Sequence, residues 1–405
     1  MSHPKQTSRY YRPELDALRF FAFFCVFLFH RWTYVAKPGR DLLQAGLYGL
    51  PLFFLLSAFL ITELLLRERE QTGTVHIAAF YMRRILRIWP LYFAVFWSLW
   101  LLGRHLPTVS PAPGAWLPFS FFLGNWFVIH HGWMSFPVDP LWSIAVEEQF
   151  YLFIPTLARF GGARALAIVG MVLLAVSYSV AGHFALHPPA RSTALWCNSF
   201  FQFQFFAGGM LLAVLLHGRK LRIAPAVRLA MGFGGLAGWL AASVLLRPLL
   251  GLHSNPPAPA LGEALLYWAL ILLGGILLLV AVMDMPSRAV PRSLAYLGKI
   301  SYGLYLFHCM VLMTIIILWR DLAVRRLGLS LSFDWIGTPL AFALTAGLAA
   351  LSYRYFESPF LRLKERFTFV RSRPVDAAAE SMDSCKDQHG DRPTGERRNG
   401  RSEEP

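Results

Sequence analysis

Ten apolar runs of about twenty residues constrain this chain more than any other feature. An α-helix of that length crosses the hydrocarbon core of a bilayer at about 1.5 Å of rise per residue. Since lipid offers no partners for backbone polar groups, such runs span as helices. The runs cover residues 15–35, 43–66, 88–104, 141–159, 164–183, 197–217, 227–248, 262–283, 300–319 and 334–356. The sequence therefore predicts an all-α, polytopic integral membrane protein with about ten transmembrane helices.

The composition agrees with a membrane protein. Of the 405 residues, 56% are hydrophobic and 15% charged, whereas about a quarter of a soluble domain is charged. The formal charge of +15 does not indicate a nucleic-acid partner, because the basic residues lie in short loops and the tail, where they set topology. The four cysteines (Cys25, Cys197, Cys309 and Cys385) show no metal-ligand spacing. We therefore expect a lipid bilayer as the surroundings and no metal site.

The connecting segments predict the orientation. With a cytoplasmic N-terminus, the segments predicted to lie inside hold 28 of the 38 Lys and Arg residues. This bias predicts cytoplasmic N and C termini. An eleventh apolar stretch, residues 117–130, is shorter and contains Gly124 and Asn125. We interpret it as a re-entrant or interfacial element on the outer side, because a span there would place residues 217–228 outside.

The sequence predicts three parts along the chain. Residues 1–14 are a cytoplasmic N-terminal segment, and residues 15–366 form the transmembrane domain. The first run lacks a small-residue cleavage site, so we interpret it as a retained span. Residues 367–405 are polar, highly charged and without periodicity, which predicts a disordered cytoplasmic tail.

A basic and a titratable residue share one face of the first run. Arg19 precedes His30 by eleven residues, which returns a helix to within about 20° of its starting direction. Such groups are costly in a membrane unless they face protein or water, so they are functional candidates. The structural alternatives are an i,i+3 pair of Arg19 with Asp16 and a helix-packing role for His30.

Two further groups flank apolar runs. Arg84 and Arg87 lie at i,i+3 before the third run, where guanidinium groups suit phosphate or merely anchor the helix at the lipid headgroups. Ser143 and Glu147 stand four residues apart at the start of the fourth run. Acids in that position either line a cavity or face water at the outer interface.

The late runs carry weaker signals. His308 lies deep in the ninth run, after Tyr302 and Tyr305, and these side chains are typical of packing. Near the end of the last span, Glu357 is expected to pair with Arg354 at i,i+3.

In this order, the motifs resemble the membrane-bound acyltransferase-3 family, which O-acylates carbohydrates and other hydroxyl-bearing molecules. Arg19 and His30 fit its basic-then-ten-then-histidine pattern, and the other two motifs match RxxR and SxxxE. The sequences ISYGLYLFH and YFESP match its late spans. The resemblance implies a multi-pass protein of the cell membrane, with a bacterial inner membrane as the expected location. It also implies acyl-CoA, most often acetyl-CoA, as the donor, and a cell-surface polysaccharide, lipopolysaccharide or other glycolipid as the acceptor.

The predicted positions of these residues in the membrane suggest roles in such a transfer. Arg84 and Arg87 would hold the donor's phosphates, and Arg19 would guide the donor. His30 would act as general base or transient acyl carrier, and Glu147 would orient it or stabilise its charge. Ser143 is a catalytic candidate together with His30 and Glu147. The main alternative is a secondary transporter that uses His30 and Glu147 as a proton relay. A non-enzymatic scaffold is disfavoured, because buried ionisable groups would then cost stability to no purpose.

Overall fold

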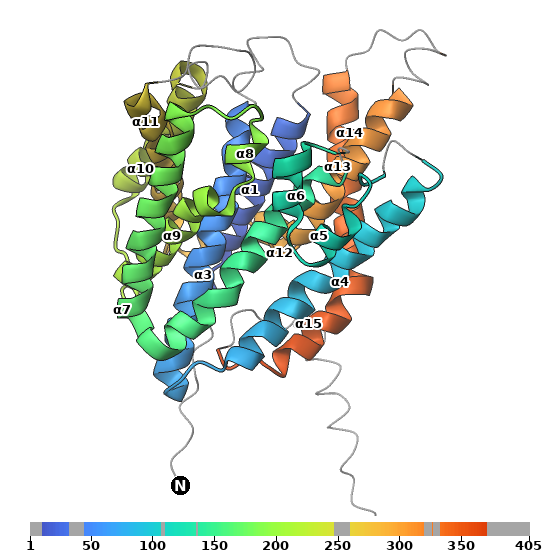
Figure 1. The fold of residues 1–405 in the computed structure, drawn as a ribbon. Helices are drawn as coiled ribbons and strands as arrows, with labels where there is room; N and C mark the ends of the chain where they lie inside the picture. Colours follow the sequence, from blue (N-terminus) through green and yellow to red (C-terminus); the bar gives the residue numbers. More distant parts are fainter. Residues whose placement is uncertain are drawn as a thin grey trace, which may run out of the picture. The chain divides into compact units, whose positions relative to one another are not determined.

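The computed structural model describes residues 10–31, 44–106, 110–134, 137–246, 260–319, 326 and 333–370. Every regular element in these ranges is helical (Figure 1), so the predicted all-α class is confirmed. Residues Arg12–Phe369 form one compact unit, which contains everything described below. Most of the predicted tail lies outside the described residues.

The long helices follow the predicted spans. They are α1 (Pro13–His30), α3 (Gly49–Thr72), α4 (Ile77–Gly103), α7 (Trp142–Leu186), α9 (Ser199–Leu216), α10 (Pro225–Ala241), α11 (Leu261–Val282), α13 (Ser301–Leu318) and α14 (Phe333–Leu351). The short helices are η2 (Ala45–Tyr48), α5 (Trp116–Ser120), α6 (Gly124–His131), η4 (Asp139–Leu141), α8 (Thr193–Trp196), η5 (Ala242–Leu246), η7 (Ser287–Ala289), α12 (Arg292–Lys299), η9 (Ser352–Glu357) and α15 (Ser358–Glu365). Within the described ranges, eight helical segments are long and apolar enough to cross a membrane. The chain is therefore a multi-pass membrane protein.

Helices α1 and α7 account for the difference between eight segments and ten predicted spans. Helix α1 matches the first predicted span but is not among the eight. Helix α7 is broken at Gly162, whose φ of 57° is left-handed, a conformation that favours glycine. Its two arms run in opposite directions (Figure 1) and match two predicted spans. The exact count and the orientation in the membrane stay predictions.

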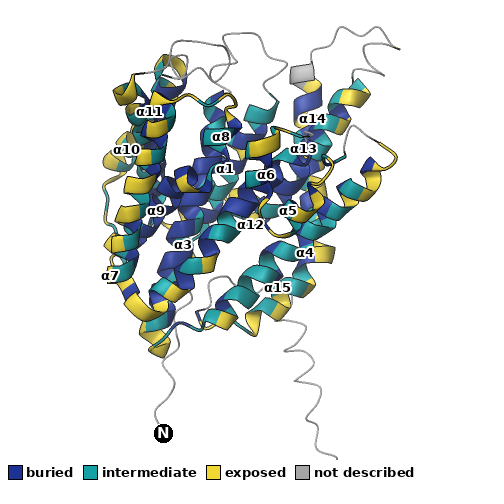
Figure 2. Ribbon diagram, viewed as in Figure 1, coloured by how far each residue is buried: buried dark blue, intermediate teal, exposed yellow. Residues whose placement is uncertain are grey.

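The core lies where α9 packs against both α7 and α3. Figure 2 shows the burial concentrated on α3 and α9, with exposed residues on the outer faces of α7 and α10. A Cβ atom at Gly209 of α9 would lie 2.1 Å from the Leu55 carbonyl oxygen of α3, so the two backbones touch. Small residues permit this close approach, which is how helices associate in membranes.

The connections predicted to be cytoplasmic meet at one end of the bundle. Asp284, after α11, accepts hydrogen bonds from the Arg12 guanidinium at 2.7 Å and from the Leu221 backbone N–H at 2.9 Å. His217, after α9, contacts the Glu63 carboxylate of α3 at 2.7 Å. These contacts join segments far apart in the sequence, as the predicted topology requires.

The stretch at 117–130 contains all but the first residue of α5 and all but the last residue of α6. With five and eight residues these helices are far too short to span a bilayer. The buried amide of Asn125 donates to the Ser199 hydroxyl at 2.9 Å and to the Cys197 carbonyl at 3.0 Å. Their polar contacts thus tie this element to the start of α9.

Candidate active site

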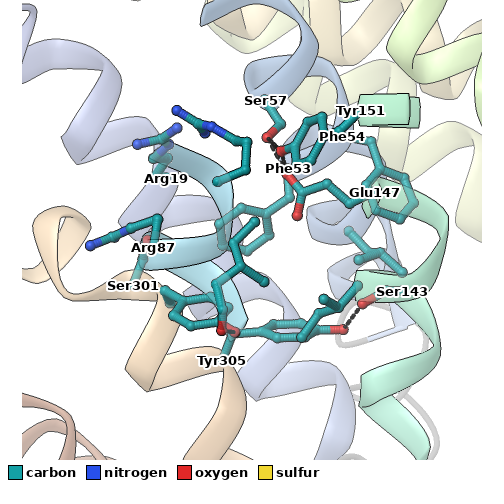
Figure 3. Close-up of a pocket in the computed structure, with 15 residues that line it drawn as sticks. Arg19, Phe53, Phe54, Ser57, Arg87, Ser143, Glu147, Tyr151, Ser301 and Tyr305 are labelled. Atoms are coloured by element: carbon teal, nitrogen blue, oxygen red, sulfur yellow. Dashed lines mark hydrogen bonds between the residues drawn. The ribbon is translucent and has the colours of Figure 1, made fainter. Parts of the chain in front are cut away.

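A cavity of about 110 Å³ lies between α1, α3, α4, α7 and α13 (Figure 3). Its polar lining consists of Arg19, Ser57, Arg84, Arg87, Ser143, Glu147, Tyr151, Ser301, Tyr302 and Tyr305. Five of the six residues singled out from the sequence therefore share one site, and His30 is the exception. In Figure 3, Arg19 and Arg87 lie on one side and Glu147, Ser57 and Tyr151 on the other.

The RxxR spacing places two arginines of α4 in the cavity and turns a third away. Arg84 and Arg87 line it, as residues three apart on a helix should. Arg83 instead donates to the Glu68 carboxylate and to the Phe367 carbonyl, each at 2.7 Å. Arg83 is therefore a structural anchor between α4 and its neighbours.

Arg84 is poised to bind an anion. Its guanidinium carbon lies 5.8 Å from the ring centres of both Phe80 and Tyr151, within cation–π range. Its Nε is buried and has no hydrogen-bond partner among the described residues. A buried N–H without a partner costs free energy, so this donor points to a ligand that supplies the acceptor.

Arg87 is held more tightly. It lies 4.0 Å from the Glu357 carboxylate, donates to the Lys299 carbonyl at 3.3 Å and stacks over Tyr302. The predicted Arg354–Glu357 pair is therefore wrong. Glu357 is buried while Arg354 is exposed, and the π-helical turn of η9 removes the α-helical i,i+3 geometry.

The Asp16–Arg19 pair of α1 matches the prediction, with 3.7 Å between Oδ1 and Nη1. Asp16 lies beside α12, because a Cβ atom at Gly298 would lie 1.7 Å from the Asp16 carbonyl oxygen. The absence of a side chain at Gly298 therefore lets α12 support the turn of α1 that presents Arg19 to the cavity.

Glu147 forms a hydrogen-bonded group that sequence reasoning did not identify. Its carboxylate accepts hydrogen bonds from the Ser57 and Tyr151 hydroxyls, which lie 2.8 Å from each other. Ser143, Glu147 and Tyr151 stand at successive four-residue steps of α7. That stripe was a usable signal for Tyr151, whereas Ser57 is an isolated hydroxyl in an apolar run.

Ser143 positions a tyrosine of α13. Its hydroxyl lies 2.7 Å from the Tyr305 hydroxyl and donates to the Pro140 carbonyl at 2.9 Å. The Tyr305 hydroxyl also lies 3.1 Å from that carbonyl. The serine of the SxxxE motif thus connects the cavity wall to α13.

His30 lies next to the site, paired with a second histidine. Its Nδ1 is 3.0 Å from the Val26 carbonyl oxygen and 3.1 Å from Nε2 of His308, which is fully buried. The ring centre of His308 lies 5.4 Å from that of Tyr305, a residue of the cavity lining. The expected contact between Glu147 and His30 is absent from the described hydrogen bonds, because Ser57 and Tyr151 take the carboxylate.

One group in the described part of the chain has metal-ligand types. His30, His308 and Cys309 each offer a donor atom, and these atoms lie within 4.8 Å of one another. The sequence did not indicate such a group, because α1 and α13 are 278 residues apart.

Comparison with known proteins gives a consistent result. The family model described as "Acyltransferase domain" matches residues 12–354. The chain is 26% identical over 405 residues to "Peptidoglycan O-acetyltransferase OatA" of Listeria monocytogenes, covering 92% of this chain and 61% of that protein. It is 27% identical over 395 residues to a "Putative O-acetyltransferase" of Staphylococcus aureus, covering 90% and 59%. The chain thus spans about three fifths of the length of these relatives. No solved structure matches it.

Proposed function

This chain belongs to the acyltransferase-3 family, and from that premise we propose that it is a membrane O-acetyltransferase. It transfers an acetyl group from cytoplasmic acetyl-CoA to a hydroxyl group of a carbohydrate at the outer side. The observation that carries the proposal is the meeting of three arginines with Glu147 and Ser143 in one cavity. The names of the relatives support acetyl as the transferred group.

The arginine side of the cavity fits the donor. Three guanidinium groups accompany one lining carboxylate, and Arg84 keeps a buried N–H in need of an acceptor. Guanidinium groups bind phosphate in bidentate fashion and keep their charge when partly desolvated. When bound, acetyl-CoA supplies the acyl group in activated thioester form. The arginines would hold its phosphates and orient it.

His30 serves as the general base of the transfer. It takes the proton of the acceptor hydroxyl while the hydroxyl oxygen bonds to the acyl carbon. The carbon–sulfur bond breaks, and the proton passes on to the departing thiolate. Positioned proton transfer of this kind contributes about 10²- to 10⁴-fold to a rate. Tyr305 lines the cavity and lies beside His308, so it connects the arginine side of the proposed site with the His30–His308 pair.

Peptidoglycan is the acceptor that we place first. Two of the relatives, from Listeria monocytogenes and Bacillus subtilis, carry peptidoglycan in their names. Lipopolysaccharide or another glycolipid is the second choice and shares the required chemistry, a sugar hydroxyl. The chain spans about three fifths of the length of these relatives, so we choose between the two acceptors by separate analysis of peptidoglycan and lipopolysaccharide.

The transporter alternative requires His30 and Glu147 to exchange a proton. In the described contacts, His30 pairs with His308 and Glu147 with Ser57 and Tyr151. The structure therefore adds no support for that relay. Acetyl-CoA consumption separates the two classes, because a transporter does not cleave the thioester.

The test compares cell-surface glycans from cells that lack the gene and cells complemented with wild type or His30→Ala. Mass spectrometry is applied separately to peptidoglycan and to lipopolysaccharide. We expect one acetyl mass to appear with wild type and not with His30→Ala, at equal amounts of protein in the membrane. Thiol release from acetyl-CoA by the purified protein is measured in parallel. Full acetylation with His30→Ala would refute the catalytic role of His30, and no thiol release with any glycan acceptor would refute the acetyltransferase.

A further inference from the structure

The His30–His308 pair has a hydrogen-bond order that can be worked out from its acceptors. Nδ1 of His308 contacts the Tyr305 carbonyl oxygen at 2.5 Å. A carbonyl oxygen accepts and never donates, so this nitrogen carries the proton. His308 is fully buried and has no contact with a carboxylate among the described residues. The ring is therefore neutral, because an unpaired buried charge is costly, and its Nε2 presents a lone pair.

The position of the proton on the His30 ring follows from its neighbours in the same way. Nδ1 of His30 lies 3.0 Å from the Val26 carbonyl oxygen and 3.1 Å from the lone pair on His308 Nε2. Both neighbours accept, so Nδ1 of His30 is the N–H donor. In a neutral imidazole the second nitrogen then holds the lone pair. The basic atom of His30 is therefore Nε2.

His308 adds a constraint that the backbone contact alone does not give. Val26 lies one turn before His30 at the end of α1, whereas His308 reaches it from a different helix. The His308 ring is itself fixed by its hydrogen bond to the Tyr305 carbonyl and by an edge-on contact with the Phe23 ring, with 5.8 Å between the ring centres. A rigid second acceptor on the same N–H holds the His30 ring in one orientation.

From this arrangement we propose that His308 is a positioning residue, which holds His30 in the tautomer with its proton on Nδ1. In this tautomer Nε2 carries the lone pair that would accept the proton of the acceptor hydroxyl. The inference rests on the proposed role of His30 as general base. It assigns a function to the α1–α13 contact, and it does not require His308 to touch a substrate.

A metal ion held by the two nitrogens that face each other, Nδ1 of His30 and Nε2 of His308, would need a different arrangement. Ligation through Nδ1 of His30 requires a lone pair on the atom that faces the Val26 carbonyl at 3.0 Å. Two acceptors would then face each other with no hydrogen between them. The Cys309 sulfur lies 3.2 Å from Nε2 of His308, where its S–H is the weaker of two donors that share this lone pair.

Two amide substitutions separate the acceptor role from packing. In His308→Gln the side-chain amide reaches the position of Nε2, where its oxygen can accept from His30. In His308→Asn the shorter amide reaches only the position of Nδ1 and leaves His30 without this acceptor. We expect His308→Asn to lose kcat by on the order of 10- to 100-fold, as on removal of groups that orient a histidine. His308→Gln keeps most of kcat, and the KM for acetyl-CoA changes in neither.

The decisive measurement is ¹⁵N NMR of histidine-labelled protein in lipid, with His30 assigned by its loss in His30→Gln. We expect the proton on Nδ1 of His30 in wild type and His308→Gln, and a shift toward Nε2 in His308→Asn. Protonation on Nε2 in the wild type, a stoichiometric metal ion in the purified protein, or an unchanged tautomer in His308→Asn would each overturn the proposal. If the tautomer shifts while kcat stays the same, the positioning stands and the role of His30 as base fails.

Discussion

Arg84 and Arg87 belong to one motif but have different partners. Arg87 is occupied by Glu357 and by the Lys299 carbonyl. Arg84 is stacked on aromatic rings with its Nε unpartnered. The first arrangement stabilises the α4–η9 contact, and the second keeps a hydrogen-bond donor ready for a ligand.

Replacing Arg84 with alanine should therefore weaken donor binding. A hydrogen bond to a charged group is worth about 1.5–3 kcal/mol, so we expect the KM for acetyl-CoA to rise by about tenfold or more. Titration calorimetry with acetyl-CoA measures the same loss directly. Arg104→Ala is the matched control, because Arg104 stacks on Trp100 at the far end of α4 and lies outside the cavity lining. Equal affinities for wild type and Arg84→Ala would exclude a phosphate contact at this residue.

The sequence predicts faces of helices better than it predicts partners. Helical spacing correctly placed Arg84 with Arg87, and Ser143 with Glu147, because these pairs depend on one helix alone. It missed the pairing of His30 with His308 and of Arg87 with Glu357, since those depend on how distant helices rotate against each other. The local i,i+3 rule failed for Glu357 because burial gave that carboxylate a stronger need for a buried cation.

At the level of helices, close backbone contacts replace a hydrophobic driving force. A Cβ atom at Gly209 would lie 2.1 Å from the Leu55 carbonyl oxygen and 3.0 Å from the Phe59 nitrogen. Both are backbone atoms of α3, so no side-chain rotation can relieve the contact. Helix α3 carries Ser57, which links this packing to the site.

Gly209→Ala should accordingly destabilise the protein. Overpacking costs about 1–3 kcal/mol, and we expect a lower thermal midpoint of the detergent-solubilised protein, followed by tryptophan fluorescence. Gly234→Ala is the control, because a Cβ atom there meets nothing within 4 Å. In that helix, alanine should be neutral or slightly stabilising. A midpoint for Gly209→Ala equal to that of Gly234→Ala would show that α3 and α9 have room to separate.

The long helices were predictable because a membrane demands twenty apolar residues for each crossing. The lengths of the spans follow from that rule, whereas the interpretation of 117–130 as an element that does not span came from the charge of the loop at 217–228. The rule does not say which helices are neighbours in the bundle. The neighbours of α1 in the bundle could not be deduced, because every apolar face looks alike to a hydropathy window.

At the scale of the whole molecule, the cluster around His217 ties α9 to α3 at the end where the polar connections meet. The His217 imidazole contacts the Glu63 carboxylate at 2.7 Å and the Glu70 carboxylate at 2.8 Å. Burial lowers the pKa of His217, but the hydrogen bonds to Glu63 and Glu70 outweigh it, so the pKa lies above its ordinary value of 6.5. Arg67 also faces this cluster, through Glu63 at 2.7 Å.

Stability should therefore fall as the pH rises above 6.5 and through the raised pKa of His217. The folded state binds the His217 proton more tightly than the unfolded state does. The stabilisation is complete below pH 6.5 and is lost as the pH passes the raised pKa. We expect the thermal midpoint of the wild type to decline as the pH rises above 6.5, and this component of the decline to disappear in His217→Gln. His187→Gln, at the exposed end of α7, should keep the wild-type profile. Identical profiles for wild type and His217→Gln would contradict the assignment.

The break in α7 determines the direction in which the later helices cross the bilayer. The chain reverses direction at a single residue, Gly162, and the guanidinium of Arg69 already fills the space of a Cβ atom there, at 1.6 Å. Were α7 to run straight, the parity of the crossings would change, and every helix from α9 onward would be inverted across the bilayer. His308 would then approach from the opposite leaflet and never meet His30. The orientation of the later helices across the bilayer thus depends on the absence of a side chain at Gly162.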